Sequence, residues 1–553
     1  MIATPRPARA IFANAALAVF YGLAFSCLTY PRIREFSSHF WADLGDGMEN
    51  VWNLWWVKEA VIDLHQSPWH TIHLHHPFGM SLHAHALSAF NGFLAIPLSA
   101  WLSPVETHNA IVLFAFTASG ITAFWLAHAV TGSAVAGLIA GYVFAFSAFH
   151  FAHTGAHLNL VSIEWLPLHL LCWLRLLERP SSGRALAAAL SLFAIYLCDY
   201  YYFAYALLAS VWFAAYEAWR RREWLFLARG EYRRPLAVFA LAFALSSGVL
   251  IAAGVRAYLE SPFVGGHDPA VLSLDLLAPF VPGGDSRFAG RTTWFWKTIR
   301  GNVNENSVFL GISTIVLAAC AFADRRRSFG LGRWSGLVVL FAVLALGPRL
   351  QVFGEEVPGL VLPYGWIETL VPAVRLSGVP IRAFVMVTLA AAVLAAAGAS
   401  ALAGRGGGSR AFAVLLFVVL VIETLPGPIP ASPPPPSGFA SSLAAKPEGS
   451  AYVEIAEPPL PNGIALYLQT IHQRPMAFGH TSRVTAAVAA GERRLRELIR
   501  ARELRALHCD YGFRYALADE HQVLEAPAES VELWQGRRGR LYDLGRGFGC
   551  AKP

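Results

Sequence analysis

Three carboxylates and a tryptophan-rich segment lie close together near the start of the chain, in an arrangement that could support acid–base chemistry. The acids are Asp43, Asp46 and Glu49, and Trp52-Asn-Leu-Trp-Trp56 follows them at once. This group comes directly after the first long apolar stretch, where aromatic residues commonly mark a membrane–water boundary. A carboxylate held at that boundary is partly dehydrated, yet it reaches both a lipid-borne substrate and water. Asp46 and Glu49 are therefore candidate catalytic acids.

Residues 47–64 mix apolar and polar positions in a pattern typical of a helix that lies on a membrane surface. Asp46 would then stand at the entrance of this helix. The helix dipole keeps a carboxylate ionised at that position, so that it can take a proton from a hydroxyl. The simpler alternative is that Asp46 only caps the helix, and the two roles are compatible.

Seven histidines fall between His65 and His85. Neutral imidazole is a common metal ligand, so a divalent metal is one interpretation of this density. The spacing matches no known metal site, and the chain has no Cys/His zinc spacing. We therefore expect no metal and no other cofactor, and we interpret His76 and His83 as groups that bind substrate.

The composition places the chain among membrane proteins. Hydrophobic residues make up 56% of it and charged residues 14%, and the mean hydropathy is +0.46, far from a soluble domain. We expect a polytopic all-α membrane protein with about twelve transmembrane helices that cross a core of roughly 30 Å. The apolar runs lie at about 10–30, 87–103, 109–130, 134–150, 160–177, 185–200, 203–220, 236–254, 307–322, 334–347, 383–403 and 410–426.

Arginine clusters in short loops mark the cytoplasmic side of the membrane. They place the loops 31–86 and 255–306 outside, together with everything after residue 426. A strict count from a cytoplasmic N-terminus fails by one between residues 31 and 150, so one segment there is re-entrant or a further span is hidden. These arginines give the net charge of +7, but no aromatic-interleaved stripe accompanies them, so nucleic acid is not an expected partner.

A proline-rich segment divides the chain into two predicted domains. Residues 1–426 would form the membrane domain, which includes the outward loops 31–86 and 255–306. Residues 427–437 form a stiff, extended linker, and residues 438–553 follow as a small extracytoplasmic α/β domain.

The predicted C-terminal domain has its own local signals. Residues 451–455 and 514–518 are typical of short strands, and residues 485–508 are typical of a charged amphipathic helix. Cys509 and Cys550 both fall in this domain, so a disulfide between them is compatible with an oxidising compartment.

Further polar groups gather at the outward ends of predicted spans. They are His150, His153, His157, Asn159 and Glu164 around one loop, and Asp199, Tyr200, Tyr201 and Tyr202 at another helix end. A carboxylate such as Asp199 is costly at a membrane boundary unless it is paired or reaches water. A functional role and an interfacial belt of tyrosines are both open interpretations.

The order of these features resembles the GT-C superfamily of integral-membrane glycosyltransferases, in its bacterial branch with a C-terminal extracytoplasmic domain. The resemblance runs through nearly the whole chain. Its motifs are Gly45-Asp46 before Trp52-Asn-Leu-Trp-Trp56, Pro77-Phe-Gly79, Phe146-Ser-Ala-Phe149 to Asn159, Asp199-Tyr-Tyr-Tyr202, Ser273-Leu-Asp275, Glu305 before Leu310-Gly311, Pro380-Ile-Arg382, Gln469-Thr-Ile-His472-Gln-Arg474 and Gly479-His-Thr-Ser-Arg483.

The resemblance implies transfer of a sugar from a polyprenyl-phosphate donor to a lipid-linked or cell-surface glycan acceptor at the outer face of the bacterial inner membrane. Asp46 corresponds to the first-loop acid of the superfamily, the presumed general base. The loop at 150–160 departs from the pattern, because histidines stand where relatives often carry an acid. Glu164 or Asp199 would then supply the second acid.

The chemistry adds a need for cations, because the phosphate leaving group must be neutralised and Arg does this through bidentate contacts. The expected step is a single displacement with anomeric inversion, in which Asp46 takes the acceptor proton. Candidate phosphate ligands are Arg256, Arg287, Arg291, Lys297, Arg300, Arg375 and Arg382. The predicted substrate-binding residues are His76, His83, His153, His157, Asn159, Glu164, Tyr201, Arg291, Glu305, Arg375 and Arg382, and the predicted catalytic residues are Asp46, Glu49 and Asp199.

A transporter or flippase for a lipid-linked glycan is the alternative function. It would need polar residues near the middle of the membrane and repeated halves. The acids and histidines instead cluster at the outward ends of the predicted spans, which favours the transferase.

Overall fold

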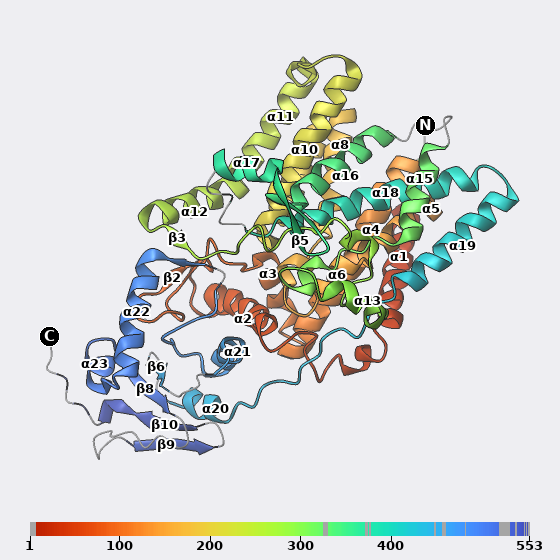
Figure 1. Cartoon of the computed structure of the whole chain (residues 1–553). Helices are drawn as coiled ribbons and strands as arrows, with labels where there is room; N and C mark the ends of the chain where they lie inside the picture. Colours follow the sequence, from red (N-terminus) through yellow and green to blue (C-terminus); the bar gives the residue numbers. More distant parts are fainter. Residues whose placement is uncertain are drawn as a thin grey trace. The chain divides into compact units, whose positions relative to one another are not determined.

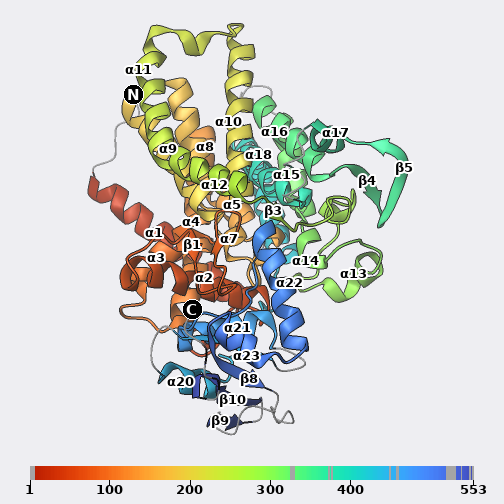
Figure 2. The ribbon, with the colours of Figure 1, turned by 90° about the vertical axis from the view of Figure 1, so that its left-hand side faces the viewer.

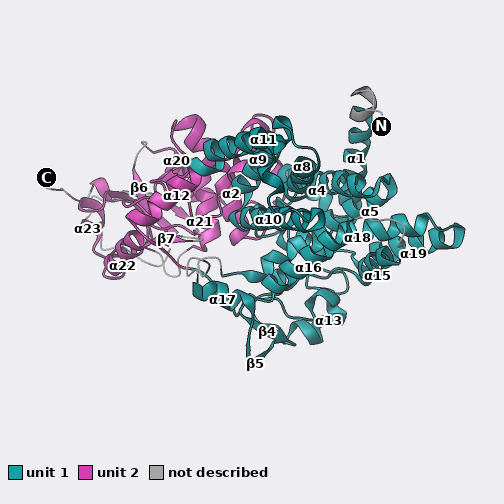
Figure 3. Ribbon diagram, turned by 90° about the horizontal axis from the view of Figure 1, so that it is seen from above, with its two compact units in different colours: residues 1–37, 109–249, 266–430 teal, residues 38–108, 250–265, 431–553 magenta. Residues whose placement is uncertain are grey.

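The computed structural model describes residues 7–323, 330–370, 374, 378–446, 450–455, 460–481, 483–518, 531–536, 539–546, 548 and 550 (Figure 1). The chain divides into two compact units, coloured separately in Figure 3. Unit 1 comprises residues 1–37, 109–249 and 266–430, and unit 2 comprises residues 38–108, 250–265 and 431–553. Each unit is thus assembled from segments that are far apart in the sequence.

Unit 1 is almost entirely helical. Its main helices are α1 (Pro7–Leu28), most of α4 (Pro104–Thr131), α5 (Ala134–Ala145), α6 (Ala148–His153), α7 (Leu158–Val161), α8 (Trp165–Glu178), α9 (Ser182–Cys198), α10 (Tyr200–Arg221), α11 (Gly230–Phe243), α13 (Ala289–Trp296), α14 (Val303–Asn306), α15 (Ile312–Phe322), α16 (Leu331–Ala345), α17 (Pro363–Leu370), α18 (Phe384–Ala403) and α19 (Gly407–Glu423). One antiparallel pair of strands, β4 (Arg349–Val352) and β5 (Glu355–Val361), joins them. Helices α8 to α11 lie side by side in Figures 1 and 2.

Helix α18 is the core of unit 1. Nearly all of its residues are buried, and it packs against α5, α15 and α16. Its many alanines let neighbouring backbones approach closely, as small residues do between membrane helices. At Gly398 the approach is so close that a Cβ would clash with the backbone carbonyl of Leu317 in α15. Helix α18 is preceded by the 3₁₀ turn η7 (Pro380–Ala383), which carries Arg382.

Within the described residues, five helical segments are long and apolar enough to cross a membrane: Ile11–Leu28, Pro104–Thr131, Ala134–His153, Gly230–Glu260 and Pro380–Ala403. The first and fourth are mostly exposed, as expected of helices with apolar faces toward lipid. Four shorter apolar helices accompany them, namely α3 (Ala89–Leu98), α9, α15 and α16. The chain is a multi-pass membrane protein, and the predicted number of about twelve spans stays a prediction.

Helix α3 bears on the span count, because the sequence predicts a span at 87–103. Its ten residues rise only about 15 Å, half of a hydrocarbon core of roughly 30 Å. It is the shortest of the apolar helices in the described part of the chain. The predicted span at 87–103 and the parity between residues 31 and 150 stay predictions.

Unit 2 combines short helices with a mixed four-stranded sheet of order β6-β8-β10-β9. Its other elements are α2 (Asp46–Lys58), the π-helical turn η2 (Glu59–Asp63), β1 (His70–Thr71), β2 (Met80–Ser81), α3, most of α12 (Val249–Glu260), β3 (Phe263–Val264), α20 (Gly438–Ala444), α21 (Asn462–His472), β7 (Val484–Thr485), α22 (Ala486–Arg500) and α23 (Leu504–Cys509). The sheet consists of β6 (Ala451–Glu454), β8 (Phe513–Ala518), β9 (Val531–Gly536) and β10 (Gly539–Asp543). β6 runs parallel to β8, with Tyr452 opposite Tyr515, and β10 runs antiparallel to β8 and β9.

Helices α22 and α23 pack against the sheet and close its core. Leu495 and Leu498 of α22 and Leu507 of α23 are buried with Phe513 of β8, while the charged positions of α22 face outward, as its amphipathic sequence predicts. The single helix predicted at 485–508 is wrong in one respect. Arg502 adopts a left-handed conformation, and the turn closes by Glu503 N–H donating to the Leu498 carbonyl, a capping pattern that ends a helix.

The first loop and the C-terminal segment belong to the same unit. Helix α2 packs between α3 and α21, and β3 pairs with β7, with Val264 opposite Val484. The C-terminal segment therefore packs on residues of the first loop, whereas the sequence predicts a separate domain at 438–553. Cys509 and Cys550 are joined by a disulfide.

Candidate active site

Helix α2 begins at Asp46, as the sequence predicts, but a different residue provides its capping bonds. Oδ1 of Asp43 accepts hydrogen bonds from the backbone N–H groups of Gly45, at 2.8 Å, and Gly47, at 2.9 Å. This is the bonding pattern by which an acidic side chain satisfies the first amides of a helix. Asp46 is the first helical residue and its side chain is half exposed. Its carboxylate can therefore take part in chemistry while Asp43 maintains the helix.

A histidine from the C-terminal segment completes this site. His480 donates from Nε2 to Oδ1 of Asp46 at 2.9 Å, and the same nitrogen lies 3.5 Å from Oε2 of Glu49. The other carboxylate oxygen of Glu49 lies 3.5 Å from Nε2 of the buried His85. Asp46 and Glu49 are thus one turn apart on α2 and are bridged by one imidazole. We refer to Asp46, Glu49 and His480 as the α2 triad.

The two acids of the α2 triad have different electrostatic surroundings. Burial raises the pKa of Glu49 to about 8, against the opposing charge of His480 and with a further contribution from Asp46. The hydrogen bond to Asp46 raises the pKa of His480, and the charges of Glu49 and Asp46 add to this against partial burial. At neutral pH the site therefore favours a protonated Glu49 and an imidazolium beside Asp46. An imidazolium beside Asp46 favours its ionised form, which a general base requires.

Three further histidines of the first loop, His75, His76 and His83, have partners within unit 2. His75 Nδ1 lies 2.6 Å from Oε1 of Glu492, and His76 Nε2 lies 3.0 Å from the Tyr511 carbonyl oxygen. His83 stacks on Trp69, and burial lowers the pKa of both His76 and His83. The predicted substrate contacts of His76 and His83 stay predictions, because the structure assigns both rings to packing.

Gln469 ties the tryptophan-rich helix to the C-terminal segment. Its Oε1 accepts a hydrogen bond from Nε1 of Trp52 at 2.7 Å. Its Nε2 donates to the carbonyl oxygens of His73, at 2.7 Å, and Arg474, at 2.9 Å. Gln469 and Trp52 are both fully buried, so this amide fixes α2 against α21 inside unit 2. It thereby holds the α2 triad in position.

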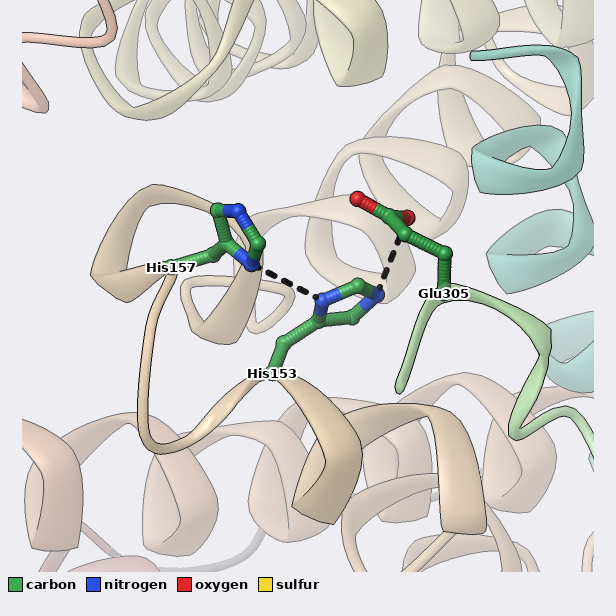
Figure 4. Close-up of side chains that lie close together, drawn as sticks. All are labelled: His153, His157 and Glu305. Atoms are coloured by element: carbon green, nitrogen blue, oxygen red, sulfur yellow. Dashed lines mark hydrogen bonds and ion pairs between the residues drawn. The ribbon is translucent and has the colours of Figure 1, made fainter. Parts of the chain in front are cut away.

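Unit 1 contains a second polar cluster, centred on Glu305 and Arg382. Arg382 donates to Oε1 of Glu305 from Nη2, at 2.5 Å, and from Nε, at 3.2 Å. His153 lies between Glu305 and His157, with Nε2 3.9 Å from Oε2 of Glu305 and Nδ1 3.4 Å from Nδ1 of His157 (Figure 4). Arg382 also lies over the ring of Tyr201, 5.0 Å from its centroid. The sequence predicts all five residues as substrate-binding groups, and the structure brings them together.

Burial would raise the pKa of Glu305, but Arg382 outweighs this effect, with a smaller contribution from His153, and holds the pKa well below its usual range. Glu305 and Arg382 therefore form an ionised pair in a buried position. A buried pair of this kind is stable only because each charge has its partner.

Asp199 and Asn159 form a separate contact in unit 1. Asn159 Nδ2 donates to Oδ2 of Asp199 at 2.7 Å, and Oδ1 of Asp199 accepts from the backbone N–H of Tyr202 at 3.0 Å. Asp199 is therefore the N-cap of α10. Glu164 is buried at the start of α8. The predicted catalytic role of Asp199 and the substrate role of Glu164 stay predictions.

The predicted phosphate ligands separate into different environments. Arg256 pairs with Glu260 on the surface of α12, at 2.8 Å, and Arg300 pairs with Glu356, at 2.6 Å. Arg291 lies over the ring of Phe288. Arg375 lies outside the described residues. Arg382 is the member of this set that is buried in a polar cluster with predicted substrate residues.

Among the residues that the structure describes, two groups of side chains could ligate a metal ion. They are the α2 triad and the group His153, His157 and Glu305, and the ligand atoms within each group lie within 4.8 Å of one another. Imidazole and carboxylate are suitable ligands for zinc and similar divalent metals. In both groups, however, a carboxylate already bonds a cationic or raised-pKa partner, Arg382 in one and His480 in the other.

His480 is the site residue to which the sequence analysis assigns no role. It appears there only within the motif Gly479-His-Thr-Ser-Arg483. Its partner Asp46 lies 434 residues away, so no local spacing connects the two. The order of motifs along the chain was the sole signal for this residue.

The chain was compared with known proteins. A search of curated proteins found no match. The arabinofuranosyltransferase AftD from Mycobacteria is similar over 99% of this chain and 42% of its own, with 14% identity and a TM-score of 0.57. ArnT from Cupriavidus metallidurans covers 97% of this chain and 99% of its own, with 11% identity and a TM-score of 0.42. The similarity to the oligosaccharyltransferase AglB from Archaeoglobus fulgidus extends over 92% of this chain and 69% of AglB, with 14% identity and a TM-score of 0.39.

The AftD structure has the GT-C fold. The likeness to AftD confirms the GT-C resemblance at the level of the fold, although the chain spans less than half the length of AftD. A family model described as "Domain of unknown function (DUF6311)" matches residues 24–424. Since this match covers well over half of the sequence, the chain belongs to the DUF6311 family.

Proposed function

We propose that the chain is an inverting membrane glycosyltransferase. It moves a sugar from a polyprenyl-phosphate donor to a lipid-linked or cell-surface glycan acceptor at the outer face of the bacterial inner membrane. The observation that supports this function is the half-exposed carboxylate of Asp46, the first residue of α2. Asp43 provides the capping bonds of this helix, and His480 donates a hydrogen bond to Asp46. The GT-C fold adds to this argument as an analogy.

In the proposed reaction, Asp46 accepts the proton of the acceptor hydroxyl. The hydroxyl oxygen bonds to the anomeric carbon of the donor sugar as the bond between that carbon and the phosphate oxygen breaks. Polyprenyl phosphate leaves with the electron pair of the broken bond, and the anomeric centre is inverted. Positioned proton transfer of this kind typically contributes about 10²–10⁴-fold to the rate.

Within unit 1, the polar cluster around Arg382 is suited to bind a phosphate group. Arg382 and the two imidazoles of His153 and His157 offer N–H donors, which bind phosphate oxygens well. The buried Glu305 fixes the guanidinium of Arg382. The ring of Tyr201 supports the other side of that group. In this proposal Asp199 has the role of holding α10, and Asn159 holds Asp199.

The experiment compares cell-envelope glycolipids by mass spectrometry in strains that carry the wild-type chain, Asp46→Asn or Asp43→Asn. We expect Asp46→Asn to remove one sugar increment while the protein still accumulates in the membrane. Asp43→Asn is the matched control, because asparagine caps a helix as well as aspartate does. Full modification with Asp46→Asn would overturn the role of this residue.

A transporter or flippase is the second candidate, because the buried Glu305–Arg382 pair places a charged arginine within the candidate span Pro380–Ala403. The two functions separate in detergent micelles, where no bilayer exists to be crossed. Transfer of labelled sugar by the purified chain in micelles would support the enzyme. Movement of lipid-linked glycan in proteoliposomes without any transfer would support the transporter.

A further inference from the structure

A cavity of about 280 Å³ adjoins the α2 triad within unit 2. It is lined by residues of β6, α21, α22 and the segment between α21 and β7, and His480 is part of its wall. Its volume is close to the lower end of the roughly 300–1,000 Å³ range of small-molecule sites. The cavity therefore has room for one small ligand, and that ligand would lie next to the imidazole that bonds Asp46.

The wall of the cavity combines polar groups with an aromatic ring. Its polar groups are Glu454, Asn462, His480, Arg496 and Arg500, and Phe478 supplies the ring. Planar amide, carboxyl and guanidinium groups suit the hydroxyl groups of a sugar, because each of them can make two parallel hydrogen bonds. The cavity thus has the composition of a site with apolar walls and a few convergent polar groups.

The charges in the cavity favour an anion. Arg496 and Arg500 stand one turn apart on α22, and both line the cavity. Arg496 lies over the ring of Phe478, 4.2 Å from its centroid. Its Nη2 is 3.7 Å from Oε2 of Glu492, which is a long distance for an ion pair. Arg500 has no carboxylate partner among the residues that the structure describes. Glu454 offsets only part of this charge near neutral pH, because burial raises its pKa to about 7.

We propose that this cavity binds an acidic sugar unit of the acceptor glycan, with the anionic group on Arg496 and Arg500 and a hydroxyl directed toward His480, whose imidazole bonds Asp46. The inference rests on the proposed function, because it identifies the acceptor of the same reaction. Asn462 and Glu454 bind further hydroxyl groups. Glu454 is held for this role by the N–H of Leu460, which donates to its Oε1 at 2.7 Å.

The test measures ligand binding by saturation-transfer NMR on the purified full-length chain in detergent. The probes are D-glucuronate, D-glucose and inorganic phosphate. We expect D-glucuronate to bind more tightly than the other two. Its affinity should fall about tenfold or more in Arg496→Ala and Arg500→Ala, since each loses a charge-assisted hydrogen bond. Arg493→Ala, an exposed position of α22 outside the cavity, is the matched control and should bind like the wild type.

The outcomes separate this proposal from the proposed function. Asp46→Asn should keep D-glucuronate binding, because Asp46 does not line the cavity, even where it abolishes transfer. Equal binding of D-glucose, tighter binding of phosphate, or unchanged D-glucuronate binding in both arginine variants would overturn the acidic-acceptor site. These binding results do not depend on the transfer activity of Asp46→Asn. The glycolipid experiment therefore tests the role of Asp46 independently.

Discussion

His480 donates a hydrogen bond from Nε2 to Oδ1 of Asp46 at 2.9 Å, across 434 residues of sequence. The contact links the C-terminal segment to the proposed base within unit 2. In the proposed mechanism, the C-terminal segment therefore contributes His480, which positions the base. An imidazolium beside Asp46 keeps the carboxylate ionised and correctly turned, while Glu49 remains protonated one helical turn away.

The first prediction concerns the pH dependence of this pair. The folded-state pKa of His480 is raised, so the stabilisation from the pair is fully present below the unfolded pKa near 6.5. It is lost as the pH rises through the folded pKa. The titratable groups that interact with His480 include Asp46, Glu49 and His85. We expect His480→Gln to lower the free energy of unfolding by about 1 kcal/mol or less, because both side chains are more than one-third exposed.

The measurement is the difference in melting temperature between wild type and His480→Gln, followed from pH 5 to pH 9 by intrinsic fluorescence. The difference should be largest at the acid end and shrink as the pH rises. Asn462→Ala, which removes the weaker contact at Nδ1 of His480 at 3.4 Å, is the control and should leave this trend in place. A difference that grows with pH would contradict the assignment.

The second prediction concerns Glu49, whose pKa is raised like that of His480 but chiefly by burial. Burial raises its pKa to about 8, so the folded state binds its proton more tightly than the unfolded state does. The wild type should therefore lose stability as the pH rises from about 4.5 to about 8 and then level off. Glu49→Gln, which mimics the protonated form, should remove this loss.

The check is the melting temperature of Glu49→Gln relative to wild type over the same pH range. The variant should match the wild type near pH 5 and exceed it above pH 8. In the transfer assay it should remain active near pH 6, where Glu49 is neutral in the wild type. Glu497→Gln, on the exposed side of α22, is the control. Equal melting curves at all pH values would show that Glu49 is ionised in the folded chain.

The sequence predicts the local parts of this site well, and the physical reason is that they depend on neighbours in the chain. The start of α2 at Asp46 follows from the change between the acidic turn and the tryptophan-rich segment. The strands at 451–455 and 514–518 correspond to β6 and β8. The order of motifs predicts five substrate-binding residues that the structure brings into contact: Glu305, Arg382, His153, His157 and Tyr201.

The parts that the sequence does not predict depend on long-range or atypical contacts. Nothing near His480 identifies Asp46 as its partner. The break between α22 and α23 has no glycine to mark it, because Arg502 itself adopts the left-handed conformation. The proline-rich linker suggests a free domain, but Gln469 and the β3–β7 pairing hold the C-terminal segment to unit 2. The capping role expected of Asp46 belongs to Asp43, three residues earlier.

The third prediction concerns Gln469. Truncation to alanine leaves the indole N–H of Trp52 and the carbonyl oxygen of Arg474 without the Gln469 amide, while the His73 carbonyl oxygen keeps the N–H of Met476 as donor. Each unsatisfied group costs about 1–3 kcal/mol, so Gln469→Ala should destabilise the chain by about 2 kcal/mol or more. Gln469→Glu keeps the acceptor for Trp52 but loses the donor. Its stability should fall between that of the wild type and that of Gln469→Ala. A melting temperature within one degree of wild type for Gln469→Ala would contradict the bridge.

The fourth prediction concerns the buried Glu305–Arg382 pair. Removing one partner leaves an uncompensated buried charge, which typically costs about 3–5 kcal/mol. Glu305→Gln and Arg382→Gln should therefore each reduce the amount of folded protein in the membrane. The double variant should recover part of the loss, because it removes both charges. Additive losses in the double variant, measured by detergent-resistant folded protein, would show that the two side chains are not coupled.

The fifth prediction concerns metal dependence. A divalent ion in the group His153, His157 and Glu305 would compete with Arg382 for the Glu305 carboxylate, and an ion in the α2 triad would have to displace the proton of His480. Both competitions disfavour the ion, because it would repel the buried guanidinium of Arg382 in the first group and must release a proton in the second. We expect transfer activity to survive EDTA within about twofold. Loss of activity in EDTA with recovery on adding Mg²⁺ or Mn²⁺ would contradict this, and metal titration of Glu49→Gln and Glu305→Gln would then show which group holds the ion.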